Sequence, residues 1–315
     1  MSNRISLSAR GRRPQLVHTL VLAALAAACS VSPGGSPTPV ASPGPSATPV
    51  ATPSPTFAPE QVPHPTGPTD VVLRMEQGGG FVPFGWMVTQ APTFTLYGDG
   101  TVIFRPLQDK EGGTSPEDGL PRFLVGTMTE DGVQALLTYA LTTGRLATAR
   151  ESYEDPMIAD ASTTVFMLNA GGEEKVVSVY ALSEMFEPGR DAADRQGFAQ
   201  LANLLINFEQ EADSGSVDNL TLYDPELYRV VLFDDMGEPV AEPVAWPWDD
   251  ISLDDFPLGE EPGNRTRVLT RQQVAELIDV PSGGRSSIWV EAPDGSLVSF
   301  AVRPLLPDEA AGIEA

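Results

Sequence analysis

The chain has 315 residues, of which 43 are acidic and 19 are basic, and it contains a single cysteine. Its formal net charge of −24 repels polyanions, so we expect neither nucleic acid nor anionic lipid headgroups as partners. One cysteine excludes a disulfide within the chain, so the fold has to be stabilised by its hydrophobic core.

The first 28 residues have the pattern of an export signal peptide. Four arginines and no acidic residue precede an apolar run over residues 16–28, which is too short to span a bilayer as a helix. The run leads into the sequence LAAAC at residues 25–29, where small residues precede the lone Cys29. This sequence resembles the lipobox of bacterial lipoproteins, in which signal peptidase II cleaves before a cysteine that carries diacylglycerol. The resemblance implies a protein anchored by lipid through Cys29 on the extracytoplasmic face of the cell membrane.

Two features of this signal leave alternatives open. Ala26 occupies the position at which lipoboxes usually carry leucine, and Ala26 with Ala28 also fits the A-x-A pattern of ordinary signal peptidase at the same cleavage site. The alternative is therefore a secreted protein without a lipid. Arg12-Arg13 matches part of a twin-arginine signal, so both the general and the twin-arginine export routes stay open.

Residues 29–69 predict a disordered tether behind the lipidated cysteine. The segment is rich in proline, serine and threonine and has almost no apolar side chains to bury, so it cannot form a core. In an extended conformation, at about 3.1 Å per residue, such a segment reaches on the order of 100 Å. Removal of residues 1–28 takes away four arginines and no acid, which leaves 15 basic and 43 acidic side chains and a net charge of −28.

The globular region is expected over residues 70–315, and its patterns predict antiparallel hairpins. Apolar residues alternate on both sides of three turns with the sequences GDG, GG and DG, and glycine and aspartate tolerate the backbone conformation of tight turns. The predicted hairpins span residues 93–104, 165–182 and 288–302. Further strands are expected at 71–75, 123–128 and 229–233.

Apolar residues recur at helical spacing in three segments. They predict helices at 133–141 and 198–208 and a third helix that starts at Thr270 and ends before Pro281. Thr270 and Gln273 have the spacing of a capping box at the start of this third helix.

These elements predict an α+β fold. Each helix has to bury its apolar stripe, so we expect antiparallel sheet built from hairpins, with about three helices packed on one face. Residues 70–212 and 213–315 are candidate subdomains. The segments FTLYGDGTVIF (94–104) and TTVFMLNAGG (163–172) are similar to uncharacterised domains of bacterial exported proteins, over about half of the globular region. This resemblance implies no activity.

Side chains on which several enzyme classes depend are missing from the predicted globular region. Both histidines, His18 and His64, precede residue 70, and no cysteine follows Cys29. A Ser-His-Asp or Cys-His nucleophile needs an imidazole, and a zinc site needs nitrogen or thiolate donors, so we exclude both. The three glycines at 78–80 lead into Phe-Val-Pro rather than a helix, and therefore do not predict a phosphate-binding loop.

The most distinctive segment runs from Ala245 to Asn264 and combines acidic with aromatic side chains. Neighbouring carboxylates repel one another unless they are hydrated or bridged by a cation, and Ca²⁺ binds oxygen ligands on flexible loops. The candidate calcium ligands are Asp249, Asp250, Asp254 and Asp255, and the candidate ligand-binding aromatics are Trp246 and Trp248. Their spacing does not fit an EF-hand loop. The alternative is a solvated acidic loop whose aromatic side chains pack on the sheet.

The sequence therefore favours a non-catalytic binding or interaction module on the outer face of the cell membrane. Its expected partners are the membrane, through the lipid anchor, and an envelope protein or glycan; its one candidate cofactor is Ca²⁺. A carboxylate-dependent hydrolase of cell-wall or extracellular glycan is the alternative, because glycosidases need only a pair of carboxyl groups. A purely structural envelope protein is the third interpretation.

Overall fold

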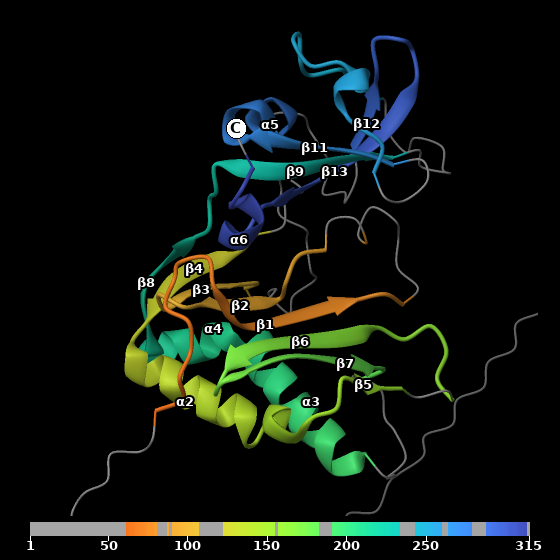
Figure 1. Ribbon diagram of the computed structural model, residues 1–315. Helices are drawn as coiled ribbons and strands as arrows, with labels where there is room; N and C mark the ends of the chain where they lie inside the picture. Colours follow the sequence, from red (N-terminus) through yellow and green to blue (C-terminus); the bar gives the residue numbers. More distant parts are fainter. Residues whose placement is uncertain are drawn as a thin grey trace, which may run out of the picture. The chain divides into compact units, whose positions relative to one another are not determined.

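The computed structural model describes residues 61–80, 87, 90–106, 122–154, 157–182, 191–233, 243–259, 264–278 and 288–313 (Figure 1). All of them belong to one unit that extends from Phe57 to Ala315. The export signal, Cys29 and most of the predicted tether lie outside the described residues. No helix among the described residues is long and apolar enough to cross a bilayer.

The first sheet contains eight strands in the order β5-β7-β6-β1-β2-β3-β4-β8. All neighbouring strands run antiparallel except β5 and β7. Two of the predicted hairpins form its framework, and in one of them Phe94 pairs with Phe104 across a turn in which Gly100 has a φ of 85°. The strands are β1 (Val71–Gly78), β2 (Phe94–Tyr97), β3 (Thr101–Phe104), β4 (Leu124–Met128), β5 (Ser152–Tyr153), β6 (Thr163–Ala170), β7 (Glu173–Tyr180) and β8 (Val217–Leu222).

Helices α2 (Glu130–Leu141), α3 (Ala192–Ile206) and the short α4 (Phe208–Glu211) cover one face of this sheet (Figure 1). Their apolar residues, at the helical spacing seen in the sequence, share one buried core with alternate residues of the strands. Phe208 packs edge-to-face against two aromatic rings of the β2–β3 hairpin, with ring centroids 4.7 and 5.1 Å away. Thr129 caps α2 by accepting a hydrogen bond from Gly132 N. Short helical turns at Leu146–Thr148 (η1) and Ala212–Ser216 (η2) complete this part.

The second sheet contains five strands in the order β10-β12-β13-β9-β11. The predicted third hairpin supplies β12 and β13, and α5 packs against β9 and β11. The strands are β9 (Leu227–Phe233), β10 (Val244–Ala245), β11 (Asn264–Thr270), β12 (Ile288–Glu291) and β13 (Leu297–Pro304); the helices are η3 (Leu253–Asp255), α5 (Arg271–Ile278) and, after β13, α6 (Pro307–Ala310).

The capping box predicted for α5 is confirmed. Thr270 N donates to Gln273 Oε1 at 2.9 Å, and Gln273 N donates back to Thr270 Oγ1 at 3.4 Å. Leu269 and Val274, which flank this box, are both buried in the core of the second sheet. Two backbone donors at the start of the helix are thereby satisfied by side chains, and apolar side chains before and after the box are buried in the same core.

The C-terminal segment covers the other face of the first sheet. Leu306 is buried with Tyr97 and Ile103, which alternate along β2 and β3 with residues of the helix-covered core and therefore point the opposite way. Tyr223 Oη donates to Leu305 O at 2.7 Å. The chain thus leaves the second sheet at the end of β13 and returns to the first.

The predicted α+β class is confirmed, with one refinement of the helix arrangement. The first sheet carries α2 and α3 on one face, whereas α5 packs on the second sheet rather than beside them. Each sheet has its own apolar face, so each needs its own cover. The chain changes from the first sheet to the second between Leu222 and Leu227. The assignment of subdomains stays a prediction.

The last residues of the predicted tether lie against the folded region. Val62 N donates to Gln134 Oε1 at 2.7 Å, Gln134 Nε2 donates to Val62 O at 3.0 Å, and Gly171 N donates to Pro63 O at 2.8 Å. His64 Nε2 lies 3.3 Å from Glu130 Oε1, and only 6% of the histidine side chain is exposed. Proline carbonyls accept hydrogen bonds as well as any others, so a proline-rich segment can still dock. Placing His64 outside the ordered region was therefore wrong, and the ordered chain begins before Asp70.

Candidate functional site

The acidic segment predicted to bind calcium lies beside the second sheet, and a hydrogen-bonded capping box closes its short helix η3. Asp255 Oδ2 accepts hydrogen bonds from Ser252 N at 2.7 Å and from Ser252 Oγ at 2.8 Å, so its carboxylate caps η3. These backbone and side-chain hydrogen bonds from Ser252 hold the pKa of Asp255 below its usual value. Arg267 approaches the other oxygen at 3.8 Å. One of the four candidate calcium ligands therefore already has partners within the protein.

The other three candidate ligands, Asp249, Asp250 and Asp254, are exposed. Within the described part of the chain, no three acidic, histidine or cysteine side chains come together in a group that could hold a metal ion. Glu260 and Glu261 lie outside the described residues. The calcium site gains no support from the described residues and stays a prediction.

The two tryptophans of this segment pack in the core of the second sheet. Trp248 is only 4% exposed, and its Nε1 donates to Gln273 O at 2.8 Å. Trp246 is half-buried; its ring meets that of Trp248 edge-to-face at 5.3 Å and that of the fully buried Phe256 at 6.1 Å. This is the arrangement expected if the aromatics pack on the sheet, and Trp248 has no exposed face on which a sugar can stack.

A cavity of about 430 Å³ lies where the ends of β1 and β6 meet the C-terminal segment. We call it the α6 cavity. Its walls come from residues 76–79, from residues 90–92, from Thr163 and Val165, and from Arg303 and Glu309. The segment with three glycines does not have the pattern of a phosphate-binding loop, but two of its residues, Gly78 and Gly79, line the α6 cavity.

An ion pair between Arg303 and Glu309 forms one wall. Arg303 Nη1 and Nη2 donate to the two carboxylate oxygens of Glu309 at 2.8 and 2.7 Å, and Leu306 N donates to Glu309 Oε2 at 2.9 Å. Burial opposes ionisation of Glu309, but the hydrogen bonds and charge of Arg303 outweigh it, so the pKa of this carboxyl lies below its usual value. The Glu309 carboxylate is therefore ionised and fully engaged.

A second ion pair fastens α6 to the first sheet. Arg74 Nη2 donates to Asp308 Oδ1 at 2.7 Å, and Tyr97 Oη donates to the same oxygen at 2.6 Å. Arg74 Nε also donates to Thr95 Oγ1, and Arg74 as a whole is only 8% exposed. Burial acts against ionisation of Asp308, yet the hydrogen bonds from Arg74 and Tyr97 hold its pKa below the usual value. Burial and the bond to Asp308 raise the pKa of Tyr97, which keeps the phenol protonated.

Glu76 is the wall residue whose charge is not matched. Among the residues that the structure describes, no cationic side chain lies within ion-pair distance of its carboxylate. Burial raises the pKa of Glu76, the positive charges of Arg74 and Arg303 lower it, and the negative charges of Glu309 and Asp308 raise it; the net effect is a raised pKa. The cavity therefore holds a half-buried carboxyl group that lacks a counter-ion.

Gln90 lines the cavity and carries a polar atom that no other group satisfies. Its Nε2 is buried and has no hydrogen-bond partner. A buried donor without a partner costs about 1–3 kcal/mol, so such an atom in a cavity wall indicates a place for an acceptor. The side chain lies tightly over β1, because a Cβ on Gly78 would be only 2.7 Å from Gln90 Oε1. Gly78 therefore makes room for the carboxamide.

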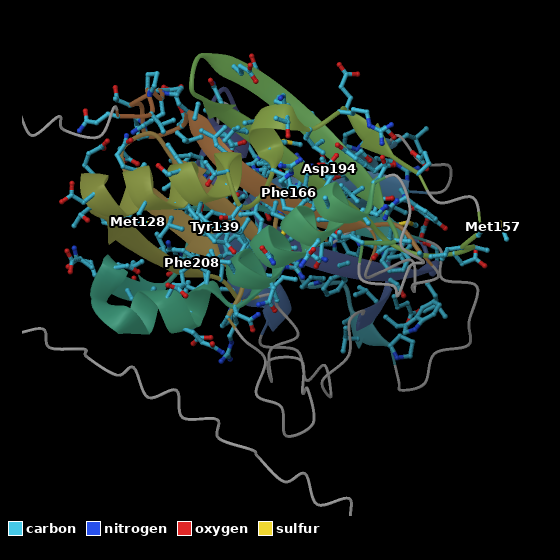
Figure 2. The ribbon with its side chains drawn as sticks, turned by 90° about the horizontal axis from the view of Figure 1, so that it is seen from below. Met128, Tyr139, Met157, Phe166, Asp194 and Phe208 are labelled. Carbon is cyan, nitrogen blue, oxygen red and sulfur yellow. The ribbon has the colours of Figure 1, made fainter. Side chains whose placement is uncertain are left out.

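A second concave surface lies on the outer side of the helices. It has a volume of about 500 Å³, and Figure 2 shows its Tyr139 between α2 and the α3–α4 segment. Four carboxamide side chains, at residues 200, 203, 207 and 210, follow the outer face of α3 and α4. Asn207 Nδ2 already donates to Asn203 O and Oδ1. This surface offers neutral hydrogen-bonding groups and the carboxylate of Glu211 but, within the described residues, no buried polar atom that lacks a partner.

The residues of the α6 cavity were not among the sites predicted from the sequence. The available signal was a charged residue within an otherwise apolar strand: Arg74 and Glu76 in VVLRMEQ, and Arg303 in LVSFAVRP. Such residues either face solvent or need a partner when buried. Their partners Asp308 and Glu309 follow the last strand, where nothing in the pattern links them to β1.

Comparison of the chain with protein-family models, with curated proteins and with solved structures finds no match. The two resemblances drawn from the sequence, to lipoproteins and to domains of exported proteins, therefore stay predictions.

Proposed function

We propose that the protein is a lipid-anchored binding module on the extracytoplasmic face of the cell membrane, and that the α6 cavity holds its ligand. The observation that carries the binding role is the buried, unpartnered Gln90 Nε2 in a wall of the cavity. A volume of about 430 Å³ is within the usual range for small-molecule sites, roughly 300–1,000 Å³. The anchoring role rests on Cys29 and the tether-like sequence behind it.

The groups around the cavity support binding better than catalysis. Glu309, the second carboxylate of the cavity wall, accepts hydrogen bonds from Arg303 on both oxygens and from Leu306 N. A nucleophile or general base needs a free lone pair directed at the substrate. His64, the one imidazole in the described part of the chain, lies beside Glu130 at the start of α2 and is not among the residues that line the cavity.

A hydrolase is the second candidate, because of one specific observation. The pKa of Glu76 is raised and that of Glu309 is lowered, and carboxyl groups with opposite shifts serve as acid and base in glycosidases. If the protein is such an enzyme, Glu76→Gln abolishes release of reducing sugar from cell-wall glycan. If the wild-type protein releases none, this candidate falls.

Binding in the cavity is tested with the mature protein in neutral detergent and a panel of small polar metabolites. A ligand that binds only the folded state raises the unfolding temperature as its concentration increases. We expect at least one compound to do so for the wild type and for the exposed control Gln272→Leu, and not for Gln90→Leu. A compound that stabilises Gln90→Leu as strongly as the wild type would place the site elsewhere.

Anchoring is tested separately. Cys29→Ser removes the residue that would carry all of the acyl chains, so we expect the protein to move from the membrane fraction to the soluble fraction. Wild-type protein found wholly in the medium, with an unmodified Cys29, would support the secreted alternative instead.

A further inference from the structure

We propose that the α6 cavity selects small ligands that carry an ammonium group next to a hydrogen-bond acceptor, with the ammonium group paired to Glu76 and the acceptor bound by Gln90 Nε2. This inference rests on the proposed function and names the chemical class of its ligand.

The first argument is the balance of charge in the walls. Arg303 is neutralised by Glu309 through two hydrogen bonds, and Arg74, behind the wall, is neutralised by Asp308. Glu76 then remains as the uncompensated charge among the described lining residues. A part-buried negative charge favours a cation, because the attraction between charges is stronger away from bulk water.

The same balance disfavours an anionic ligand. A carboxylate in the cavity would meet Glu76 and Glu309 and would find the lining arginine already engaged. Arg105 lies close enough to interact electrostatically with Arg303, and its Nε is buried without a hydrogen-bond partner, but its Nη2 donates to Ala91 O, its guanidinium group packs over the Phe123 ring and it does not line the cavity. An anion in the cavity would therefore have to compete with Glu309 for Arg303, the arginine that lines it.

The second argument is the position of the donor. Gln90 and Glu76 line the same cavity of about 430 Å³, so one small molecule can reach both. An ammonium group satisfies the carboxylate, and a carbonyl or hydroxyl oxygen on the same molecule satisfies Gln90 Nε2. Neither group then remains buried without a partner.

Binding of this kind is linked to pH. The groups that act on Glu76 are Arg74 on its own strand, Arg303 at the end of β13, and Asp308 and Glu309 on α6. Their combined effect with burial is a raised pKa, so Glu76 loses its charge at a higher pH than an ordinary glutamate does. Ammonium binding requires the charged form. Affinity is therefore complete above this raised pKa and falls as the pH decreases through it.

The experiment uses the mature protein in neutral detergent and two probes measured by isothermal titration calorimetry. L-Alaninamide carries an ammonium group beside a carbonyl group, and N-acetyl-L-alaninamide keeps the carbonyl groups without the charge. We expect the first to bind the wild type at least tenfold more tightly than the second. Glu76→Gln should remove this preference, whereas Glu174→Gln, which deletes the same charge from the exposed part of β7, should retain it. Thermal unfolding establishes that both variants fold.

Each remaining outcome has a definite meaning. If the acetylated or an anionic probe binds as tightly as L-alaninamide, and Gln90→Leu abolishes that binding, the cavity is a site but the ammonium preference is wrong. If L-alaninamide binds equally to wild type and Glu76→Gln, Glu76 does not recognise the cation. If neither probe binds and no compound of the metabolite panel depends on Gln90, the proposed binding function falls as well.

Discussion

The chain contains two acidic regions that behave in opposite ways. In the segment before β11, Asp249, Asp250 and Asp254 are exposed and Asp255 caps a single helical turn. At the C-terminus, two adjacent acids, Asp308 and Glu309, lie partly buried against Arg74 and Arg303 and hold α6 in place. The first region has more acidic residues, and the second has more influence on the fold. Burial and partners, rather than the density of charge in the sequence, decide what a carboxylate contributes.

The largest effect that this comparison predicts comes from Asp308→Asn. The substitution leaves the buried guanidinium of Arg74 without its counter-ion, and removal of one partner from a buried pair costs about 3–5 kcal/mol. Since 22% of the Asp308 side chain is exposed, we expect a loss near the lower end, about 3 kcal/mol, in denaturant unfolding. The matched control Asp250→Asn, in the exposed segment, should change stability by less than about 0.5 kcal/mol. Equal effects would abolish the distinction between the two regions.

Acid should remove the stability that the C-terminal ion pairs contribute. The pKa values of Asp308 and Glu309 lie below their ordinary values of 3.8 and 4.5, so their contribution to stability is complete above those values. It is lost as the pH falls through the lower folded-state values. Unfolding measured between pH 6 and pH 2 should therefore show a shallower acid limb for Asp308→Asn than for wild type. An unchanged limb would mean that these pairs do not control acid stability.

Glu76 should respond to pH in the opposite direction. Its raised pKa means that its charge destabilises the folded state at neutral pH, and protonation removes this cost. Glu76→Gln should therefore raise the unfolding temperature at pH 7, and the gain should disappear below the ordinary glutamate value of 4.5. Glu174→Gln provides the control for the change in net charge. A variant that is destabilised at pH 7 would contradict the assignment of Glu76 as an uncompensated charge.

Gly78→Ala separates ligand binding from stability, because it disturbs the Gln90 side chain in the cavity and leaves the two ion pairs of α6 in place. A Cβ at this position would press on the end of the Gln90 side chain, which can move. Stability should thus change by less than about 1 kcal/mol, whereas ligands that depend on Gln90 should lose about tenfold in affinity, equivalent to about 1.4 kcal/mol. Calorimetry with L-alaninamide measures the second effect. Retained affinity would show that the Gln90 carboxamide is not held by its contact with Gly78.

The smallest expected effect belongs to the exposed segment and its proposed calcium ion. Ca²⁺ bridging the exposed aspartates would change Trp fluorescence, because Trp246 and Trp248 lie in the same segment, and Asp250→Asn with Asp254→Asn would abolish the change. The reference is NaCl at the same ionic strength, since screening alone stabilises a chain of this charge. Equal shifts in Ca²⁺ and NaCl would leave these aspartates as solvated charges.

Local patterns were sufficient to predict much of the fold. The three hairpins, the helices and the cap at Thr270 depend on spacings of a few residues, and those signals are strong in the sequence. β8 (VDNLTL) and β11 (NRTRVLT) were missed, because polar and charged residues interrupt their apolar alternation. Both are the last strand in the order of their sheet, where a strand pairs with one other strand only.

The candidate site could not be predicted from such local patterns. Arg74 and Asp308 are separated by 234 positions, and no periodicity connects them. Gln90 is a polar residue between two predicted strands, and only the folded chain shows that its Nε2 is buried without a partner. The acidic segment, by contrast, has a conspicuous composition, yet its two tryptophans pack in the core of the second sheet.

The docking of residues 62–64 has a mechanical consequence for a protein held at one end. If Cys29 is fixed in a membrane, a pulling force enters the folded region at Val62, where the Gln134 carboxamide holds the backbone by two hydrogen bonds. When those hydrogen bonds break, the load passes to the contacts of Pro63 and His64 and then to β1, which is bonded to β2 on one side and to β6 on the other. Two ladders then share the tension. In a protein anchored in this way, the few hydrogen bonds of residues 62–64 would break before the two ladders of β1.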